Sequence, residues 1–155
     1  MAKHGARSHV KTILTTMLAA ALLWTASAMA QDYGSARRTV EIRFVRADNK
    51  KADETEEALA DILPLLRQNL RFTRYRLISR RTVALSEGQR IPLAYGYTLN
   101  FSNVQSQALT VHIFRQQQML LRTRLRLKSR RPVLLGGFPH AGDSTLIAVL
   151  KLMED

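Results

Sequence analysis

The chain contains no cysteine, and this absence excludes disulfides, thiolate nucleophiles and cysteine-ligated metals. Histidine is scarce as well, because only His112 and His140 occur beyond residue 30. A structural zinc or copper site needs three or four converging ligands. Apart from two histidines only carboxylates could serve, and these are concentrated in residues 53–61. We therefore expect no metal site and no other cofactor.

Long apolar runs are also rare, and the one that occurs lies in residues 13–24. Three basic residues precede it, and the small-x-small triplet Ala-Met-Ala, ending at Ala30, follows it. This order is typical of a secretory signal peptide that is cleaved after the triplet. The run has about a dozen residues, whereas a membrane-spanning helix needs roughly 20. The sequence predicts a cleavable signal peptide at residues 1–30, and an uncleaved N-terminal anchor is the alternative.

Cleavage after Ala30 would leave residues 31–155, a length that suits one exported domain. Small exported domains of animals usually carry disulfides. The signal peptide and the absence of cysteine together favour a bacterial envelope protein. We expect it in the periplasm, with secretion or anchoring by the signal as alternatives, and with no transmembrane segment after cleavage.

Acidic residues are few compared with basic ones. The chain has 24 Lys and Arg against 12 Asp and Glu, and three of the basic residues lie in the leader, so residues 31–155 carry 21 cations and a net charge of +9. Of those 21 cations, 17 are arginine, whose planar guanidinium matches carboxylates and phosphates. This bias favours a surface that recognises anions. The codon bias of a GC-rich genome is the alternative explanation.

The hydrophobic period changes from strand-like to helical and back along residues 31–155. Apolar residues recur at helical spacing in residues 53–70 after a capping-box-like start, and Pro64 is expected to kink or restart that helix. Alternating patterns predict strands at residues 39–46, 71–85 (one long strand or two short ones), 91–101, 109–114, 121–128, 133–135 and 145–152. The expected fold is α+β, with one N-terminal helix packed on a mostly antiparallel, curled β-sheet of about seven strands.

The clearest strand pattern, in residues 121–128, places four cations on one side. Alternate residues of a strand lie roughly 7 Å apart, so such a row repels itself unless an anion meets it. The candidate residues for binding an anion or a partner are Arg122, Arg124, Arg126, Lys128, Arg74 and Arg76. The last two extend the row only if their strand is adjacent. A solvated face that blunts pairing at a sheet edge is the alternative role.

Nucleic acid is the first ligand that such a charge suggests. The export signal argues against it, and so does the lack of aromatic residues interleaved with the arginine row for base stacking. Anionic phospholipid, lipopolysaccharide phosphates or an acidic protein fit the predicted compartment better.

Catalytic residues are hard to find. His140, Asp143 and Ser144 lie close together in sequence, but a catalytic triad needs separately positioned elements and an oxyanion hole. His112 lies on a predicted strand, where a structural role is expected. We therefore expect no enzymatic activity.

Three segments, at residues 70–77, 132–137 and 146–150, are similar to segments of small exported bacterial proteins of unknown function. The resemblance implies export and a βα-then-β layout, and it implies no activity and no functional residues. The expected function is that of a non-enzymatic periplasmic accessory protein whose arginine-rich strand face binds an anionic surface or an acidic partner. A structural subunit or adaptor that associates by pairing of strand edges is the alternative.

Overall fold

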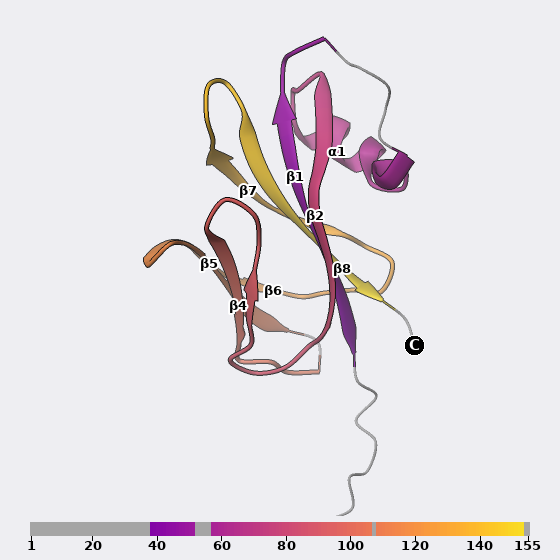
Figure 1. Ribbon diagram of the computed structural model, residues 1–155. Helices are drawn as coiled ribbons and strands as arrows, with labels where there is room; N and C mark the ends of the chain where they lie inside the picture. Colours follow the sequence, from indigo (N-terminus) through magenta and orange to yellow (C-terminus); the bar gives the residue numbers. More distant parts are fainter. Residues whose placement is uncertain (1–37, 52–56, 107, 154–155) are drawn as a thin grey trace, which may run out of the picture. The chain divides into compact units, whose positions relative to one another are not determined.

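The computed structural model describes residues 38–51, 57–106 and 108–153. The predicted signal peptide at residues 1–30 and the predicted helix start at residues 53–56 lie outside these ranges. In chain order the elements are β1 (Thr39–Asp48), the 3₁₀ turn η1 (Glu57–Leu59), α1 (Leu63–Asn69), β2 (Arg74–Ala84), β3 (Arg90–Pro92), β4 (Tyr97–Ser102), β5 (Leu109–Arg115), β6 (Gln118–Leu125), β7 (Val133–Pro139) and β8 (Thr145–Met153) (Figure 1).

The eight described strands form two antiparallel sheets. The first sheet has the order β2-β1-β8-β7 and the second has the order β3-β4-β5-β6. The α+β class and the antiparallel pairing are confirmed, whereas the prediction of one curled sheet with about seven strands is wrong. The extra strand arises because the predicted strand at residues 91–101 is split by a turn, in which Tyr95 and Gly96 have φ angles of 58° and 74°. Two such left-handed residues reverse the chain between β3 and β4.

The two sheets enclose one hydrophobic core between them. From the first sheet, Val40, Ile42 and Phe44 of β1 point into this core and are fully buried. Alternate residues of β4 and β5 meet them from the second sheet, which gives β4 the regular buried and half-buried alternation that the sequence predicts. Ala36–Asp155 form one compact unit, and every described member of the core belongs to it.

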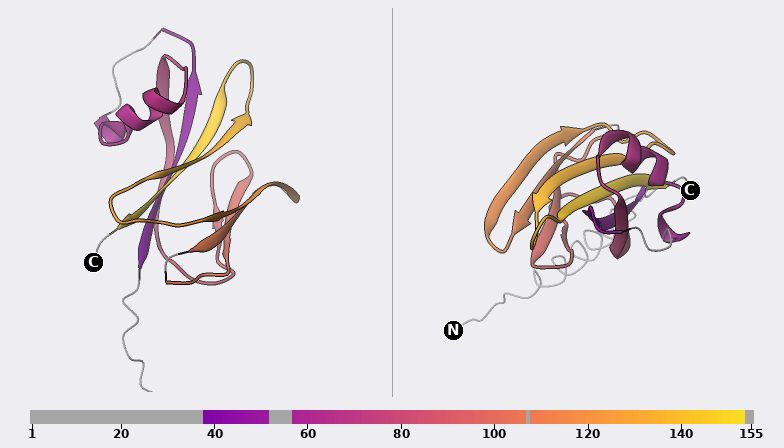
Figure 2. Two further views of the ribbon diagram at one scale, coloured as in Figure 1. Left: turned by 180° about the vertical axis from the view of Figure 1, so that it is seen from behind. Right: turned by 90° about the horizontal axis from the view of Figure 1, so that it is seen from above.

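A second, smaller core lies on the opposite face of the first sheet, where α1 covers it (Figure 2). Val45 and Ala47 of β1 contribute to this core, so β1 is buried on both faces. The predicted restart at Pro64 is confirmed, since η1 ends at Leu59 and Pro64 lies in the first turn of α1. Within the described ranges no helix covers the outer face of the second sheet.

Two charged residues of β1 are buried where that strand passes beneath η1. Glu41 is 1% exposed, and its carboxylate accepts hydrogen bonds from Arg43 and Arg80. Arg43 also donates to Asp61, which accepts a further bond of 3.0 Å from Lys151. Burial acts to lower the pKa of Arg43, but its hydrogen bonds to Asp61 and Glu41 outweigh burial and raise that pKa. We call these five residues the β1 ion network; Glu41 and Arg43 are its buried members, whereas Asp61 and Arg80 are exposed.

The substitution Glu41→Gln should lower the free energy of unfolding by about 1–3 kcal/mol, because Arg43 and Arg80 lose a charged acceptor while Arg43 keeps its hydrogen bonds to Asp61. Urea denaturation of the two proteins at neutral pH measures this difference. The exposed Glu57→Gln is the matched control and should change the free energy by less than about 0.5 kcal/mol. Equal stability of the two variants would contradict a structural role for the network.

Acid should weaken the fold through Asp48 and Asp61. Hydrogen bonds from Arg74 to Asp48, both 2.8 Å long, lower the pKa of this carboxyl to about 2, and those from Arg43 lower the pKa of Asp61 to about 2. Unfolding returns each group to its ordinary value near 3.8, so the unfolded chain binds more protons between these values. The stability contributed by both pairs is therefore complete above about pH 4 and is lost as pH falls towards about 2.

This pH dependence is checked by denaturation between pH 5 and pH 2. We expect Asp48→Asn to be less stable at neutral pH by about 1.5–3 kcal/mol and to show a shallower acid decline. Asp143→Asn is the control, since Asp143 forms no ion pair within the described residues. An unchanged slope in Asp48→Asn would show that its pair with Arg74 does not govern the acid response.

Candidate functional site

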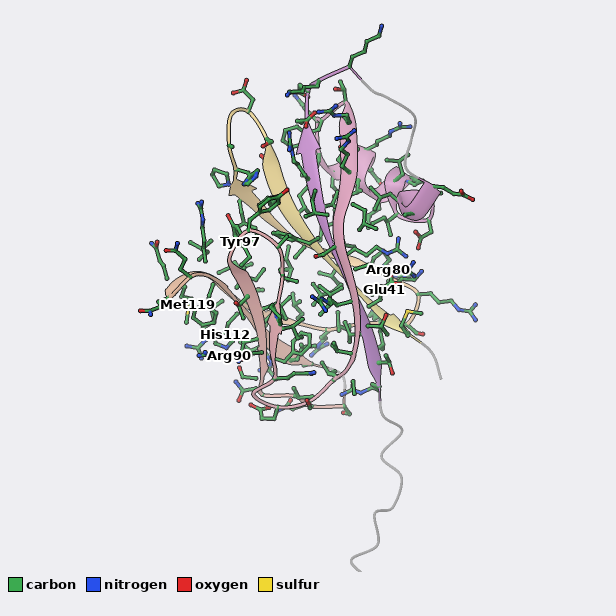
Figure 3. The ribbon with its side chains drawn as sticks, viewed as in Figure 1. Glu41, Arg80, Arg90, Tyr97, His112 and Met119 are labelled. Atoms are coloured by element: carbon green, nitrogen blue, oxygen red, sulfur yellow. The ribbon has the colours of Figure 1, made fainter. Side chains whose placement is uncertain are left out.

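The outer face of the second sheet gathers cations from both of its edge strands. Arg90 of β3 pairs with Asn100, Asn100 pairs with His112, and His112 pairs with Arg122 of β6, so these four residues form one row across the sheet. Ser102, Thr110 and Arg124 form the next row. We call these seven residues the basic sheet face. Figure 3 shows Arg90 and His112 on one side of the molecule, away from Glu41 and Arg80.

These residues point outward because their neighbours are committed to the core. Leu99 and Phe101 are fully buried beneath β4, and Val111 and Ile113 are fully buried beneath β5. The period of two then turns Asn100 and the other intervening residues away from the core, although Thr110 is only 7% exposed. On β6 the same alternation leaves the two arginines exposed.

The hydrogen bonds that the described residues make on the basic sheet face involve no carboxylate. Ser102 Oγ lies 2.8 Å from His112 Nε2, and Arg124 donates a 3.2 Å hydrogen bond to the Gln105 side-chain carbonyl. Within the described residues Arg90, Arg122 and Arg124 have no carboxylate partner. By contrast, the first sheet pairs Glu41, Asp48 and Asp61 with basic residues. The positive charge of the face is therefore not neutralised internally.

The sequence contains an acid-free stretch that explains this difference. No Asp or Glu occurs between Glu87 and Asp143. Eight cations lie in that stretch: Arg90, Arg115, Arg122, Arg124, Arg126, Lys128, Arg130 and Arg131. Glu87 is itself engaged, because its carboxylate accepts the backbone N–H groups of Asn103 and Val104 at 3.0 and 2.9 Å. The whole second sheet thus lacks a side chain of negative charge.

The structure brings together only part of the predicted site. Arg122 and Arg124 share the outer face of β6, and Arg126 is exposed just beyond the end of that strand. Lys128 is also exposed, but it forms a β-bridge with Arg131 where the chain turns back to the first sheet. The regular strand therefore begins at Gln118 and ends at Leu125, three residues earlier at each end than the predicted strand at residues 121–128.

Arg74 and Arg76 do not extend this row, because β2 belongs to the first sheet and β6 to the second. Arg74 binds Asp48, which is only 4% exposed, so its role in this structure is that of an ion-pair partner. Arg90 takes its place on the face, although the sequence reasoning missed it. The signal that could have identified it is the absence of acids after Glu87.

Aromatic rings also lie on this face, which the spacing of residues 121–128 does not reveal. His112 and Phe114 of β5 have nearly parallel rings with centroids 6.3 Å apart. Phe114 pairs with Met119 of β6, beside the arginine rows. The lack of interleaved aromatics therefore no longer argues against nucleic acid as the ligand. The argument against nucleic acid rests on the predicted export alone.

The cluster of His140, Asp143 and Ser144 is not arranged as a nucleophile and its base. Ser144 Oγ donates to the Ala141 carbonyl at 2.7 Å. The His140 ring instead packs against Tyr95, with 4.4 Å between ring centroids. These contacts assign Ser144 to closing the turn between β7 and β8.

No group of three or more His, Asp or Glu side chains that could hold a metal ion occurs in the described part of the chain. Among the same residues, no helix has the length and apolar character needed to cross a membrane.

Removing cations from the basic sheet face should stabilise the fold at low salt. Arg122 and Arg124 repel each other without a compensating carboxylate. The variant Arg122→Gln/Arg124→Gln should therefore have a free energy of unfolding about 0.2–1 kcal/mol higher than that of the parent. The gain should vanish at high salt, because screening removes the repulsion. Thermal denaturation at two ionic strengths measures both effects, with Arg67→Gln/Arg71→Gln as the control for general charge loss. A salt-independent loss of stability would instead show that the two arginines hold the sheet together.

Comparisons of this chain with models of protein families, with characterised proteins and with solved structures find no match. The similarity to small exported bacterial proteins remains a prediction. The function must therefore be inferred from the site itself.

Proposed function

We propose that this protein is a non-enzymatic accessory component of the bacterial envelope that binds an anionic surface or an acidic partner through its basic sheet face. The observation that carries the proposal is that Arg90, Arg122 and Arg124 lie on one exposed face with no carboxylate partner in the described residues. Uncompensated cations in a row cost electrostatic energy, and an anionic ligand would relieve this cost.

The arrangement of the cations suits an extended anionic ligand better than a single small anion. Neighbouring strands lie about 4.8 Å apart, so Arg90 on β3 and Arg122 on β6 are separated by roughly 14 Å. Arg122 and Arg124 are roughly 7 Å apart along β6. Asn100 and His112, which can form hydrogen bonds, lie between Arg90 and Arg122. Several negative charges distributed over such a face would each meet a cation.

The predicted compartment supports phospholipid, lipopolysaccharide or an acidic protein as the source of that charge. The predicted signal peptide would place the protein in the periplasm, away from most nucleic acid. Each basic residue near an anionic surface contributes about 1 kcal/mol. Three arginines therefore supply about 3 kcal/mol, less than the roughly 4 kcal/mol of a millimolar complex. Binding by the face alone would be weak and strongly dependent on salt.

The test is co-sedimentation of residues 31–155 with vesicles. Anionic and neutral vesicles are compared at low and at physiological salt, beside Arg122→Ala/Arg124→Ala/Arg126→Ala and the charge-matched control Arg67→Ala/Arg71→Ala/Arg81→Ala, whose three residues are exposed elsewhere. We expect binding to the anionic vesicles that falls with salt, that is lost in the variant of residues 122, 124 and 126 and that is retained to a larger extent in the control.

Equal losses in the two variants would reduce the effect to net charge and contradict a defined site. A labelled single-stranded oligonucleotide, measured by fluorescence anisotropy under the same salt conditions, provides a further comparison. Tighter binding to the oligonucleotide than to the anionic vesicles would contradict the proposed ligand class.

A further inference from the structure

The strand β6 forms one edge of the second sheet. It is hydrogen-bonded to β5 on one side, and no other described strand pairs with its second side. Its pairing with β5 is regular from Leu121 to Leu125 and shifts register only before Leu121. The edge therefore presents an unpaired run of backbone at residues 121–125, roughly 17 Å long.

The two faces of this edge differ in chemistry. Arg122 and Arg124 project from the outer face and have no carboxylate partner in the described residues. Leu121 and Leu125 project inward, where they are half-buried against the main core. A strand added beside β6 would thus find cations on one face and the rim of the core on the other.

We propose that the partner is an extended protein segment in which acidic residues alternate with apolar ones, and that it pairs with the edge of β6. The inference rests on the proposed function and specifies the partner of the same site. Backbone hydrogen bonds to residues 121–125 supply affinity, acidic side chains lie opposite Arg122 and Arg124, and apolar side chains extend the core beyond Leu121 and Leu125.

The other sheet edges meet these requirements less well. β3 has only three residues and ends at Pro92, and β7 is interrupted by a register shift after Gly136. β2 is longer, but its Arg74 and Arg80 already bind Asp48 and Glu41. A second copy of this chain is also disfavoured at β6, because pairing two such edges would place arginines opposite arginines.

The test uses a fluorescent peptide of about nine alternating Val and Glu residues, long enough to span residues 121–125. Its binding to residues 31–155, followed by fluorescence anisotropy, is compared with that of a block peptide of the same composition, in which the Glu residues are contiguous. We expect the alternating peptide to bind at least about tenfold more tightly, because the block peptide cannot place charge and apolar groups on opposite faces.

Two N-methylated versions of the alternating peptide test the backbone pairing. Methyl groups on the odd or on the even residues block hydrogen bonding from one edge of the peptide or from the other. One version should lose binding while the other retains it, and the amides of residues 121–125 should exchange hydrogen more slowly in the complex. Equal binding of both versions, or unchanged exchange, would overturn strand addition.

The cations are tested with Arg122→Gln/Arg124→Gln, which should weaken the alternating peptide by about two- to fivefold for each lost pair. The control Arg67→Gln/Arg71→Gln should bind nearly as the parent does. If the block and alternating peptides bind equally and salt weakens both, charge alone recognises the partner. In that case pairing at the edge of β6 is contradicted, and the proposed function stands. If neither peptide nor anionic vesicles bind at low salt, both fail.

Discussion

The whole arrangement depends on burying β1 on both of its faces. One face of this strand lies in the core between the sheets, and the other lies beneath η1 and α1. The face beneath η1 includes Glu41 and Arg43, whose charges must be neutralised inside the protein. Asp61 and Arg80 of β2 complete that neutralisation. Carboxylates are thereby concentrated around the first sheet, and the acid-free second sheet retains an uncompensated positive charge.

The sequence predicts single elements of this fold better than their partners. Alternation identifies β1 and the long β2, and Pro64 correctly predicts the restart before α1. The same alternation places Arg122 and Arg124 together, because they share a strand and a face. It cannot show that Arg90 joins them or that Arg74 does not, because a period of two specifies the face of a residue and leaves its neighbouring strand undetermined. Sheet membership is set by long-range pairing, which local patterns do not encode.

The energetics of the basic sheet face suggest why a second type of contact would be needed. A few exposed cations attract any polyanion, so alone they provide little selectivity and are readily screened by salt. Backbone pairing at β6 is directional and would fix both the register and the orientation of a partner. The half-buried Leu121 and Leu125 add an apolar surface that a lipid headgroup or an inorganic phosphate could not use. Selectivity would thus come from combining charge, backbone and apolar contacts within one short strand.

The arginines of β6 also connect two roles that the sequence leaves as alternatives. Cations on an edge strand discourage pairing with neutral or basic strands, since each would bring unpaired or like charges close together. The same electrostatic cost becomes a gain when the approaching strand is acidic. Protection against aggregation and recognition of an acidic partner therefore require the same side chains, Arg122 and Arg124, and no change of structure. An edge protected in this way selects which strands can bind to it, because the charge of an approaching strand decides whether its pairing with the exposed backbone is favourable.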